Sequence, residues 1–229
     1  MPTFASFDGL QLNYTRWEGT SDALPVVLQH GFAADTNANW IGPGVVAALR
    51  AAGLTVISLD ARGHGRSEKP HDEARYQDDT MARDVSALLD ELSLDEVSLV
   101  GYSMGSIIAL SVASTDKRVR RLAIGGVGSG VVDLGGIDTR AVTPEDISAA
   151  LLTENPADAP PAGAPFRLLA DTLGGDRVAL AAVARSVRNT QVDLAAIAVP
   201  TLVLAGDADH LTRLSRANRP HPTELPFAG

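Results

Sequence analysis

The sequence predicts an α/β protein in which a mostly parallel β-sheet is flanked by helices. Short runs of aliphatic and β-branched residues alternate along the chain with longer segments whose apolar residues recur every three or four positions. This alternation is typical of a parallel sheet that helices cover on both faces. With 229 residues, 45% of them hydrophobic and 21% charged, the chain is long enough for one domain with a sizeable core.

The first predicted element is a hairpin at residues 4–17, in which Asp8-Gly9 is a turn signal and apolar and polar residues alternate after it. Further strands are predicted where short apolar runs end at glycine or aspartate, at residues 25–30, 54–59, 97–100, 121–124 and 201–205. Helices are predicted where apolar or small residues follow helical spacing, at residues 44–52, 76–92, 103–114, 144–153 and 176–189.

The alternation of strands and helices lapses between Gly125 and about Val199. This stretch holds several glycines, the last two predicted helices and, between these helices, a loop rich in proline and alanine. We interpret residues 130–198 as an insertion, or lid, over one end of the sheet, within a single domain that spans residues 1–229. The sequence GVGSG at residues 126–130 has the wrong spacing for a dinucleotide loop, and no amphipathic helix follows it directly. We therefore expect no cofactor.

The charge and composition argue against several classes of partner and site. The net charge is −9, and the basic residues cluster only at residues 117–121, apart from scattered arginines near the end, which argues against nucleic acid or an anionic membrane as the main partner. No apolar run reaches the roughly 18 residues that a membrane span needs, and the N-terminus does not resemble a signal peptide. There is no cysteine and no metal-ligand spacing of histidine or carboxylate. We therefore expect a cytoplasmic protein without a bound metal.

The segment Gly101-Tyr-Ser103-Met-Gly105 has the form G-x-S-x-G and stands where a predicted strand meets a predicted helix. In that setting the serine lies on a sharp, strained turn that exposes its hydroxyl above the sheet. The glycines are needed because side chains there would collide with the neighbouring strand and helix. We predict that Ser103 is a catalytic nucleophile. The alternative is a close-packed turn whose serine has no chemical role.

Residues 29–32, with the sequence QHGF, end another predicted strand. Acyl transfer needs two hydrogen-bond donors aimed at the oxyanion that develops on the substrate. We expect one donor to be the N–H of Met104, which follows the nucleophile. The other is the N–H of Phe32, because Gly31 lets this loop approach closely. The His30 side chain is expected to support the loop rather than to act as a base.

The loop at residues 60–67, with the sequence DARGHGRS, follows the strand predicted at 54–59. Its glycines and charged residues suit a tight loop that is held by its own hydrogen bonds. We expect His64 in this loop to be structural rather than catalytic.

Taken in order, these segments resemble the α/β-hydrolase superfamily, and the resemblance covers the chain to about residue 210. The ordered set is an N-terminal hairpin, then strands followed in turn by HGF, DARGHGRSEKP and GYSMG, then an insertion and a strand followed by AGDAD. The sequence looks most like bacterial esterases, perhydrolase-type haloperoxidases and C–C bond hydrolases of this superfamily. Serine at position 103 sets it apart from the haloalkane dehalogenases and epoxide hydrolases, which place aspartate there.

The resemblance also implies a catalytic acid. In this superfamily the acid commonly follows the strand after the insertion in the pattern G-x-x-D. Carried onto Gly206-Asp-Ala-Asp209, the pattern selects Asp209, and Asp207 on the same loop is its rival. Such an acid holds a histidine base in the right tautomer and stabilises the imidazolium that forms during attack.

The base is the open point of the sequence. The family normally continues with another helix, a last strand, a loop that bears the histidine and a final helix. Here 20 residues follow Asp209, rich in proline and arginine and without a β-branched run. The base is His221 on an irregular tail, or His210 beside the acid, or neither. The last strand and helix are expected to be missing, which leaves the strand at 201–205 as an open edge unless a homo-oligomer covers it.

The sequence thus predicts a serine hydrolase that cleaves small or short-acyl carboxylic esters through an acyl-enzyme intermediate. The expected partner is a small-molecule ester. The alternatives are a C–C bond hydrolase, a perhydrolase, and a ligand-binding or interaction protein of the same fold that lacks a working base.

Overall fold

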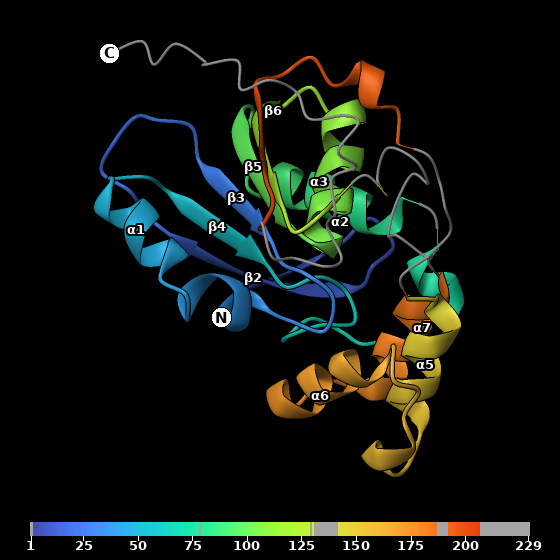
Figure 1. Ribbon diagram of the computed structural model, residues 1–229. Coiled ribbons are helices and arrows are strands. Elements are labelled where there is room, and N and C mark those ends of the chain that lie inside the picture. Colours follow the sequence, from blue (N-terminus) through green and yellow to red (C-terminus); the bar gives the residue numbers. More distant parts are fainter. Residues whose placement is uncertain (1, 78, 129, 131–141, 187–191, 207–229) are drawn as a thin grey trace, which may run out of the picture.

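The computed structural model describes residues 2–77, 79–128, 130, 142–186 and 192–206 of the chain. Seven strands form one mixed sheet in the order β1-β2-β4-β3-β5-β6-β7 (Figure 1). β2 runs antiparallel to both of its neighbours, and the other neighbouring pairs are parallel, as the sequence predicts. The strands are β1 (Thr3–Ala5), β2 (Gln11–Trp17), β3 (Val26–Gln29), β4 (Val56–Leu59), β5 (Val97–Tyr102), β6 (Val119–Gly125) and β7 (Thr201–Leu204).

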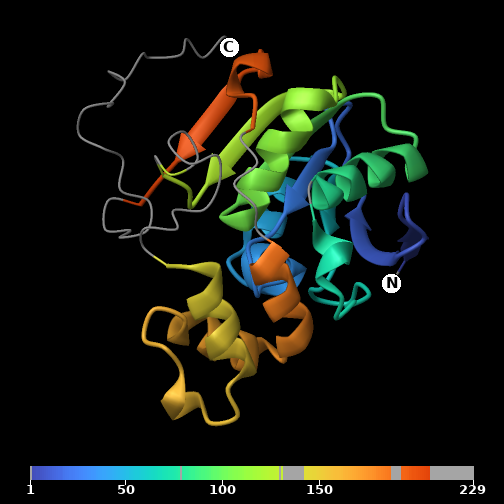
Figure 2. The ribbon, with the colours of Figure 1, turned by 90° about the vertical axis from the view of Figure 1, so that its right-hand side faces the viewer.

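Helices cover both faces of the sheet, and successive residues of the central strands face them alternately. On β3, Val27 packs in the same core cluster as residues of α2 and α3, whereas Val26 and Leu28 pack with Trp40 and with α1. Figures 1 and 2 show α1 on the side of the sheet opposite to α2 and α3. These helices are α1 (Val45–Ala51), α2 (Thr80–Glu91) and α3 (Met104–Thr115).

A helical insertion separates β6 from β7, and Figures 1 and 2 show its helices grouped below the sheet. The helices bury a core cluster of their own, which Ala33 from the loop after β3 joins. That residues 130–198 act as a lid stays a prediction. The elements are α5 (Pro144–Leu152), the short turn η3 (Pro156–Asp158), α6 (Ala164–Leu173) and α7 (Arg177–Ser186).

The sequence analysis did not predict the helix α6 or the short π-helical segment before α1. α6 begins after Gly163, which has no side chain to cap the helix, so the usual start signal is absent. The segment η1 (Asn37–Ile41) is a single π-helical turn, and such turns are rare. The predicted absence of a strand and a helix at the end of the chain concerns residues outside the described part.

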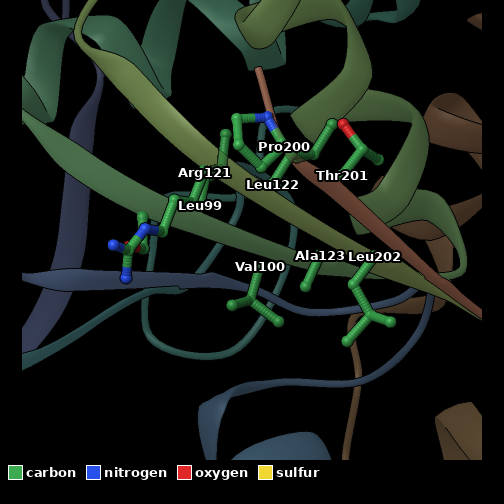
Figure 3. Close-up of a pocket in the computed structure, with 9 residues that line it drawn as sticks. Leu99, Val100, Arg121, Leu122, Ala123, Pro200, Thr201 and Leu202 are labelled. Atoms are coloured by element: carbon green, nitrogen blue, oxygen red, sulfur yellow. The ribbon is translucent and has the colours of Figure 1, made fainter. Parts of the chain in front are cut away.

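β7 forms one border of the described sheet. Its Leu202, Val203 and Leu204 are 53%, 53% and 57% exposed. A hollow of about 300 Å³ lies against β5, β6 and β7, and Figure 3 shows Val100, Ala123 and Leu202 on one side of these strands. The homo-oligomer that the sequence analysis expects at this border stays a prediction. Within the described ranges, every helix is too short or too polar to cross a membrane.

Asp60, directly after β4, ties three segments of the chain together. Its carboxylate accepts hydrogen bonds from the N–H and hydroxyl of Thr36 (3.0 and 2.7 Å), the side chain of Asn13 (3.1 Å) and the N–H of Arg66 (3.0 Å). Burial alone would raise the pKa of this carboxyl. The hydrogen bonds from Thr36 and Arg66 outweigh burial and hold the pKa of Asp60 below its ordinary value.

Arg62, two residues further along, joins the N-terminal hairpin to α2. Its fully buried guanidinium donates two hydrogen bonds of 2.6 Å to Asp84 on α2 and two, of 3.0 and 3.3 Å, to Asp8 in the β1–β2 turn. Asp84 also accepts a hydrogen bond of 2.5 Å from the hydroxyl of Ser6. Breaking a buried pair on one side leaves an uncompensated charge in the interior, which is strongly destabilising.

Asp84→Ala is therefore expected to lower the free energy of unfolding by about 3–5 kcal/mol in chemical denaturation. The variant leaves Arg62 buried with Asp8 as its remaining carboxylate. The matched control is Asp90→Ala on the same helix, whose exposed pair with Arg118 is expected to contribute about 0–1 kcal/mol. A loss as small as that of the control would show that Asp84 does not hold Arg62 in place.

Asp60→Asn is expected to lower the free energy of unfolding by about 2–3 kcal/mol at neutral pH, because an amide has one acceptor oxygen where the carboxylate has two. Folding lowers the pKa of Asp60, so its ionised form stabilises the fold above the ordinary value of 3.8, and this contribution is lost as the pH falls through the folded value. The stability difference between wild type and variant should narrow below about pH 4. A difference that stays constant between neutral and acidic pH would contradict this role.

Candidate active site

Ser103 occupies the sharp turn between β5 and α3. Its backbone has φ 53° and ψ −117°, and a residue with a side chain in such a conformation carries strain of about 1–3 kcal/mol. The Ser103 N–H donates to the carbonyl of Gly125 at the end of β6 (2.8 Å), so the neighbouring strand holds the turn in place. This is the strained turn between strand and helix that the G-x-S-x-G pattern predicts.

The two glycines of the pattern let this turn pack directly against its neighbours. A Cβ at Gly105 would lie 2.0 Å from the carbonyl oxygen of Gln29 on β3, and a Cβ at Gly101 would lie 2.2 Å from the carbonyl oxygen of Gly105. Neither position can accept a side chain without a shift of the backbone. The start of α3 thus rests on the end of β3, which brings the loop after β3 beside Ser103.

The loop after β3 approaches Ser103 through Gly31, where a Cβ would lie 3.3 Å from the Cβ of Ser103. Phe32 follows Gly31, and Met104 follows Ser103. Within the described residues, the N–H groups of Phe32 and Met104 have no hydrogen-bond partner. An unpaired N–H is ordinary in the first turn of a helix, where Met104 lies, but the unpaired N–H of Phe32 lies in a loop.

Backbone strain occurs both in the loop after β3 and in the turn at Ser103. Of the described residues other than glycine, Ala33, Ser93 and Ser103 have a positive φ, of 56°, 49° and 53°. Ser93 follows the end of α2, where a left-handed residue is common. Ala33 and Ser103 belong to the two segments that meet at the candidate nucleophile, which is where functional strain is expected.

His30, the residue before Gly31, is fully buried, and both of its ring nitrogens are engaged. The N–H of Ala61 donates to Nε2 (3.0 Å), so Nδ1 carries the proton and donates to the carbonyl of Gly31 (2.8 Å). Burial lowers the pKa of His30, which favours the neutral ring. These contacts hold the Gly31 carbonyl and leave the ring no free nitrogen with which to act as a base.

His64 is also buried, with its ring centroid 5.2 Å from that of His30. Its Nδ1 donates to the carbonyl of Arg62 (2.9 Å), while Nε2 is buried without a partner among the described residues. Burial, and then the neighbouring His30, lower the pKa of His64 to about 3. A histidine with this pKa is a poor general base at neutral pH.

The Phe32 ring connects the loop after β3 to the helical insertion. It meets the ring of Phe166 on α6 at a centroid distance of 5.8 Å and the ring of His64 at 5.7 Å, both edge to face. Such distances are typical of aromatic pairs that contribute to stability. No sequence pattern singles out Phe166, because the contact joins segments that are far apart in the chain.

The candidate acids, Asp209 and Asp207, and the candidate bases, His221 and His210, lie outside the described residues. The structure therefore brings Ser103, Met104 and Phe32 to one place, and the acid and base stay predictions. In the described part of the chain, no three histidine, aspartate or glutamate side chains are grouped as a metal site requires.

Comparison with known proteins gives a family for this arrangement. The family model of the alpha/beta hydrolase fold matches residues 25–146, which is more than half of the chain. The sn-1-specific diacylglycerol lipase ABHD11 of Danio rerio is 34% identical over 117 residues, or 50% of this chain and 35% of the relative. A non-heme chloroperoxidase of Streptomyces lividans is 36% identical over 105 residues, or 46% of this chain and 36% of the relative. The match thus spans about a third of the length of these relatives.

The solved structures extend the likeness beyond the matched segment. The structure of a hydrolase from Pseudomonas aeruginosa aligns with a TM-score of 0.67 at 26% identity and covers 92% of this chain and 82% of that chain. The family model includes the loop after β3, the loop after β4 and the turn at Ser103. On these grounds the chain belongs to the α/β-hydrolase family.

Proposed function

We propose that this chain is a serine hydrolase that cleaves small carboxylic esters through an acyl-enzyme intermediate. The observation that carries the proposal is the strained turn at Ser103, packed through Gly105 on β3, beside a loop whose Phe32 N–H has no partner among the described residues. Similarity to a diacylglycerol lipase supports ester hydrolysis.

The proposed reaction begins when the base takes the proton of Ser103 Oγ and the oxygen attacks the ester carbonyl carbon. The oxyanion of the tetrahedral intermediate accepts hydrogen bonds from the N–H groups of Phe32 and Met104. Collapse breaks the ester C–O bond, the base returns its proton to the leaving alcohol, and the acyl group stays on Ser103. Water, deprotonated by the same base, then releases the carboxylic acid and restores the serine.

The proposed base is His221, oriented by Asp209. The alternatives that the sequence leaves open are His210 as base and Asp207 as acid. Without a working base the serine attacks slowly, although the oxyanion hole and substrate binding retain some catalysis.

The proposed preference for small esters rests on the contact between Phe32 and Phe166. This contact packs α6 of the insertion against the loop that carries one of the proposed oxyanion donors. We propose that this packing favours small acyl groups at Ser103.

Two other functions are favoured by particular observations. Similarity to a non-heme chloroperoxidase favours perhydrolysis, in which hydrogen peroxide replaces water and the acyl group leaves as a peracid.

A ligand-binding protein of the same fold, which lacks a working base, is favoured by the described histidines. The nitrogens of His30 and His64 are engaged or buried, and His71 contacts Asp176 at 3.0 Å. An assay with and without peroxide separates the first alternative from ester hydrolysis.

The first test is covalent labelling with a fluorophosphonate, which reacts with activated serines. Wild-type protein is expected to be labelled at neutral pH, and Ser103→Ala is expected to lose the label because it lacks the hydroxyl. Mass spectrometry of the labelled peptide locates the modified residue. Ser106→Ala is unsuitable as the control, because the Ser106 hydroxyl of the wild type forms hydrogen bonds with the carbonyls of Gly101 and Gly125. Ser21→Ala in the exposed β2–β3 loop serves instead, and absence of labelling in wild type would overturn the proposal.

The second test identifies the base. His221→Ala is expected to lower kcat on a short p-nitrophenyl ester by about 10³-fold or more, because loss of one triad member removes most of the activation of the serine. His71→Ala, which loses a histidine from an exposed pair, is the control and should keep its activity. Loss of activity in His210→Ala alone would assign the base to His210. Full activity in both His221→Ala and His210→Ala would show that neither is the base.

A further inference from the structure

The side chain of Asn39 ties the loop after β3 to the π-helical turn that follows it. Its Oδ1 accepts a hydrogen bond of 2.7 Å from the N–H of Gly31. Asn39 itself is held by its own N–H, which donates to the carbonyl of Asp35 (3.1 Å). The next residue, Trp40, is buried in the core cluster on the α1 side of the sheet. The acceptor that meets Gly31 is therefore fixed to the core.

Gly31 is the point of this loop that most needs such a fixed partner. A glycine backbone can adopt conformations that other residues cannot, and a Cβ at Gly31 would be in tight contact with Ser103, at 3.3 Å. Its carbonyl accepts from His30 Nδ1 (2.8 Å) and from the N–H of Ala34 (3.3 Å). The bond to Asn39 holds the N–H on the other side of the same residue, so both peptide groups of Gly31 are fixed.

These contacts of Gly31 determine the direction of the Phe32 N–H. This N–H belongs to the same planar, trans peptide unit as the Gly31 carbonyl and points the opposite way. Once both peptide groups of Gly31 are fixed, the direction of the Phe32 N–H is fixed too. Asn39 also occupies the Gly31 N–H, whereas the N–H of Phe32 has no partner among the described residues.

We infer that Asn39 is a positioning residue for the proposed oxyanion hole, acting through Gly31 on the N–H of Phe32. The inference rests on the proposed function, since an oxyanion forms only if Ser103 attacks a carbonyl. The side chain of Asn39 bonds the N–H of Gly31 rather than a reacting group. Its effect is on the stabilisation of the transition state rather than on substrate binding.

The loop has other anchors, so the fold does not depend on Asn39. Thr36 donates its N–H and hydroxyl to Asp60, and Ala38 N–H donates to Asp35 (2.8 Å). Removing the Asn39 side chain leaves the Gly31 N–H without its acceptor, which is expected to lower the melting temperature by about 2–10 °C. The other anchors are expected to keep the variant folded at the assay temperature, so a loss of kcat in the folded variant reports positioning rather than folding.

The experiment compares wild type with Asn39→Ala and Asn39→Asp, with Asn37→Ala as the matched control. Asn37 lies on the same turn, is exposed, and its side chain has no hydrogen bond to the described residues. With a short p-nitrophenyl ester, Asn39→Ala is expected to lower kcat by about 10- to 100-fold and to change KM by less than about 3-fold, because a misplaced donor acts on the transition state. Asn37→Ala should match wild type.

Amide hydrogen exchange at Gly31, followed by NMR, reports the hydrogen bond itself. Exchange should be faster in Asn39→Ala, and Asn39→Asp should keep it slow because aspartate retains the acceptor. An unchanged kcat in Asn39→Ala beside an active wild type would overturn the role of Asn39 alone. A fall in kcat that is explained by unfolding of Asn39→Ala at the assay temperature would show a structural role of Asn39 and would also overturn the inference. If wild type has no activity that depends on Ser103, the proposed function fails, and this role fails with it.

Discussion

The start of α3 rests on the last residue of β3 with no side chain between them, because a Cβ at Gly105 would lie 2.0 Å from the carbonyl oxygen of Gln29. The contact is possible because β3 and β5 are neighbours in the sheet, although the helices α1 and α2 and the strand β4 separate them along the chain. The remaining geometry follows from it. The chain leaving β3 passes beside Ser103, where a Cβ at Gly31 would be in tight contact with Ser103, and the next peptide reaches the candidate nucleophile.

Buried polar groups, more than apolar contacts, determine the shape of the loops at this end of the sheet. His30 holds the carbonyl of Gly31, and Asp60 holds the N–H and hydroxyl of Thr36. Hydrogen bonds are directional, whereas apolar contact is not, so such a network can keep one unpaired N–H in one orientation. Burying an ionisable carboxylate is costly, and the donors around Asp60 offset that cost.

The sequence was a good guide where short-range chemistry decides the structure. The glycines at 101 and 105, the turn at Asp8-Gly9 and the apolar runs of the strands correctly predicted the sheet and the strained serine. It failed where distant segments meet or where local signals are weak. α6 has no side-chain cap at Gly163, the contact of Phe166 with Phe32 joins segments far apart in the chain, and no local pattern marks the bond of Asn39 to Gly31. The acid and base of the site stay predictions, since Asp209 and His221 lie outside the described residues.

The buried rings of His30 and His64 have a consequence for the pH dependence of the reaction rate. The chain has five histidines. His30 cannot take a second proton without losing the N–H of Ala61, and the pKa of His64 is lowered to about 3. Burial lowers the pKa of both rings and favours their neutral forms, so neither ring adds a positive charge beside Ser103 at neutral pH. An inflection near neutrality in a pH–rate profile is therefore not expected from either of these two rings, and a histidine base has to come from elsewhere in the chain.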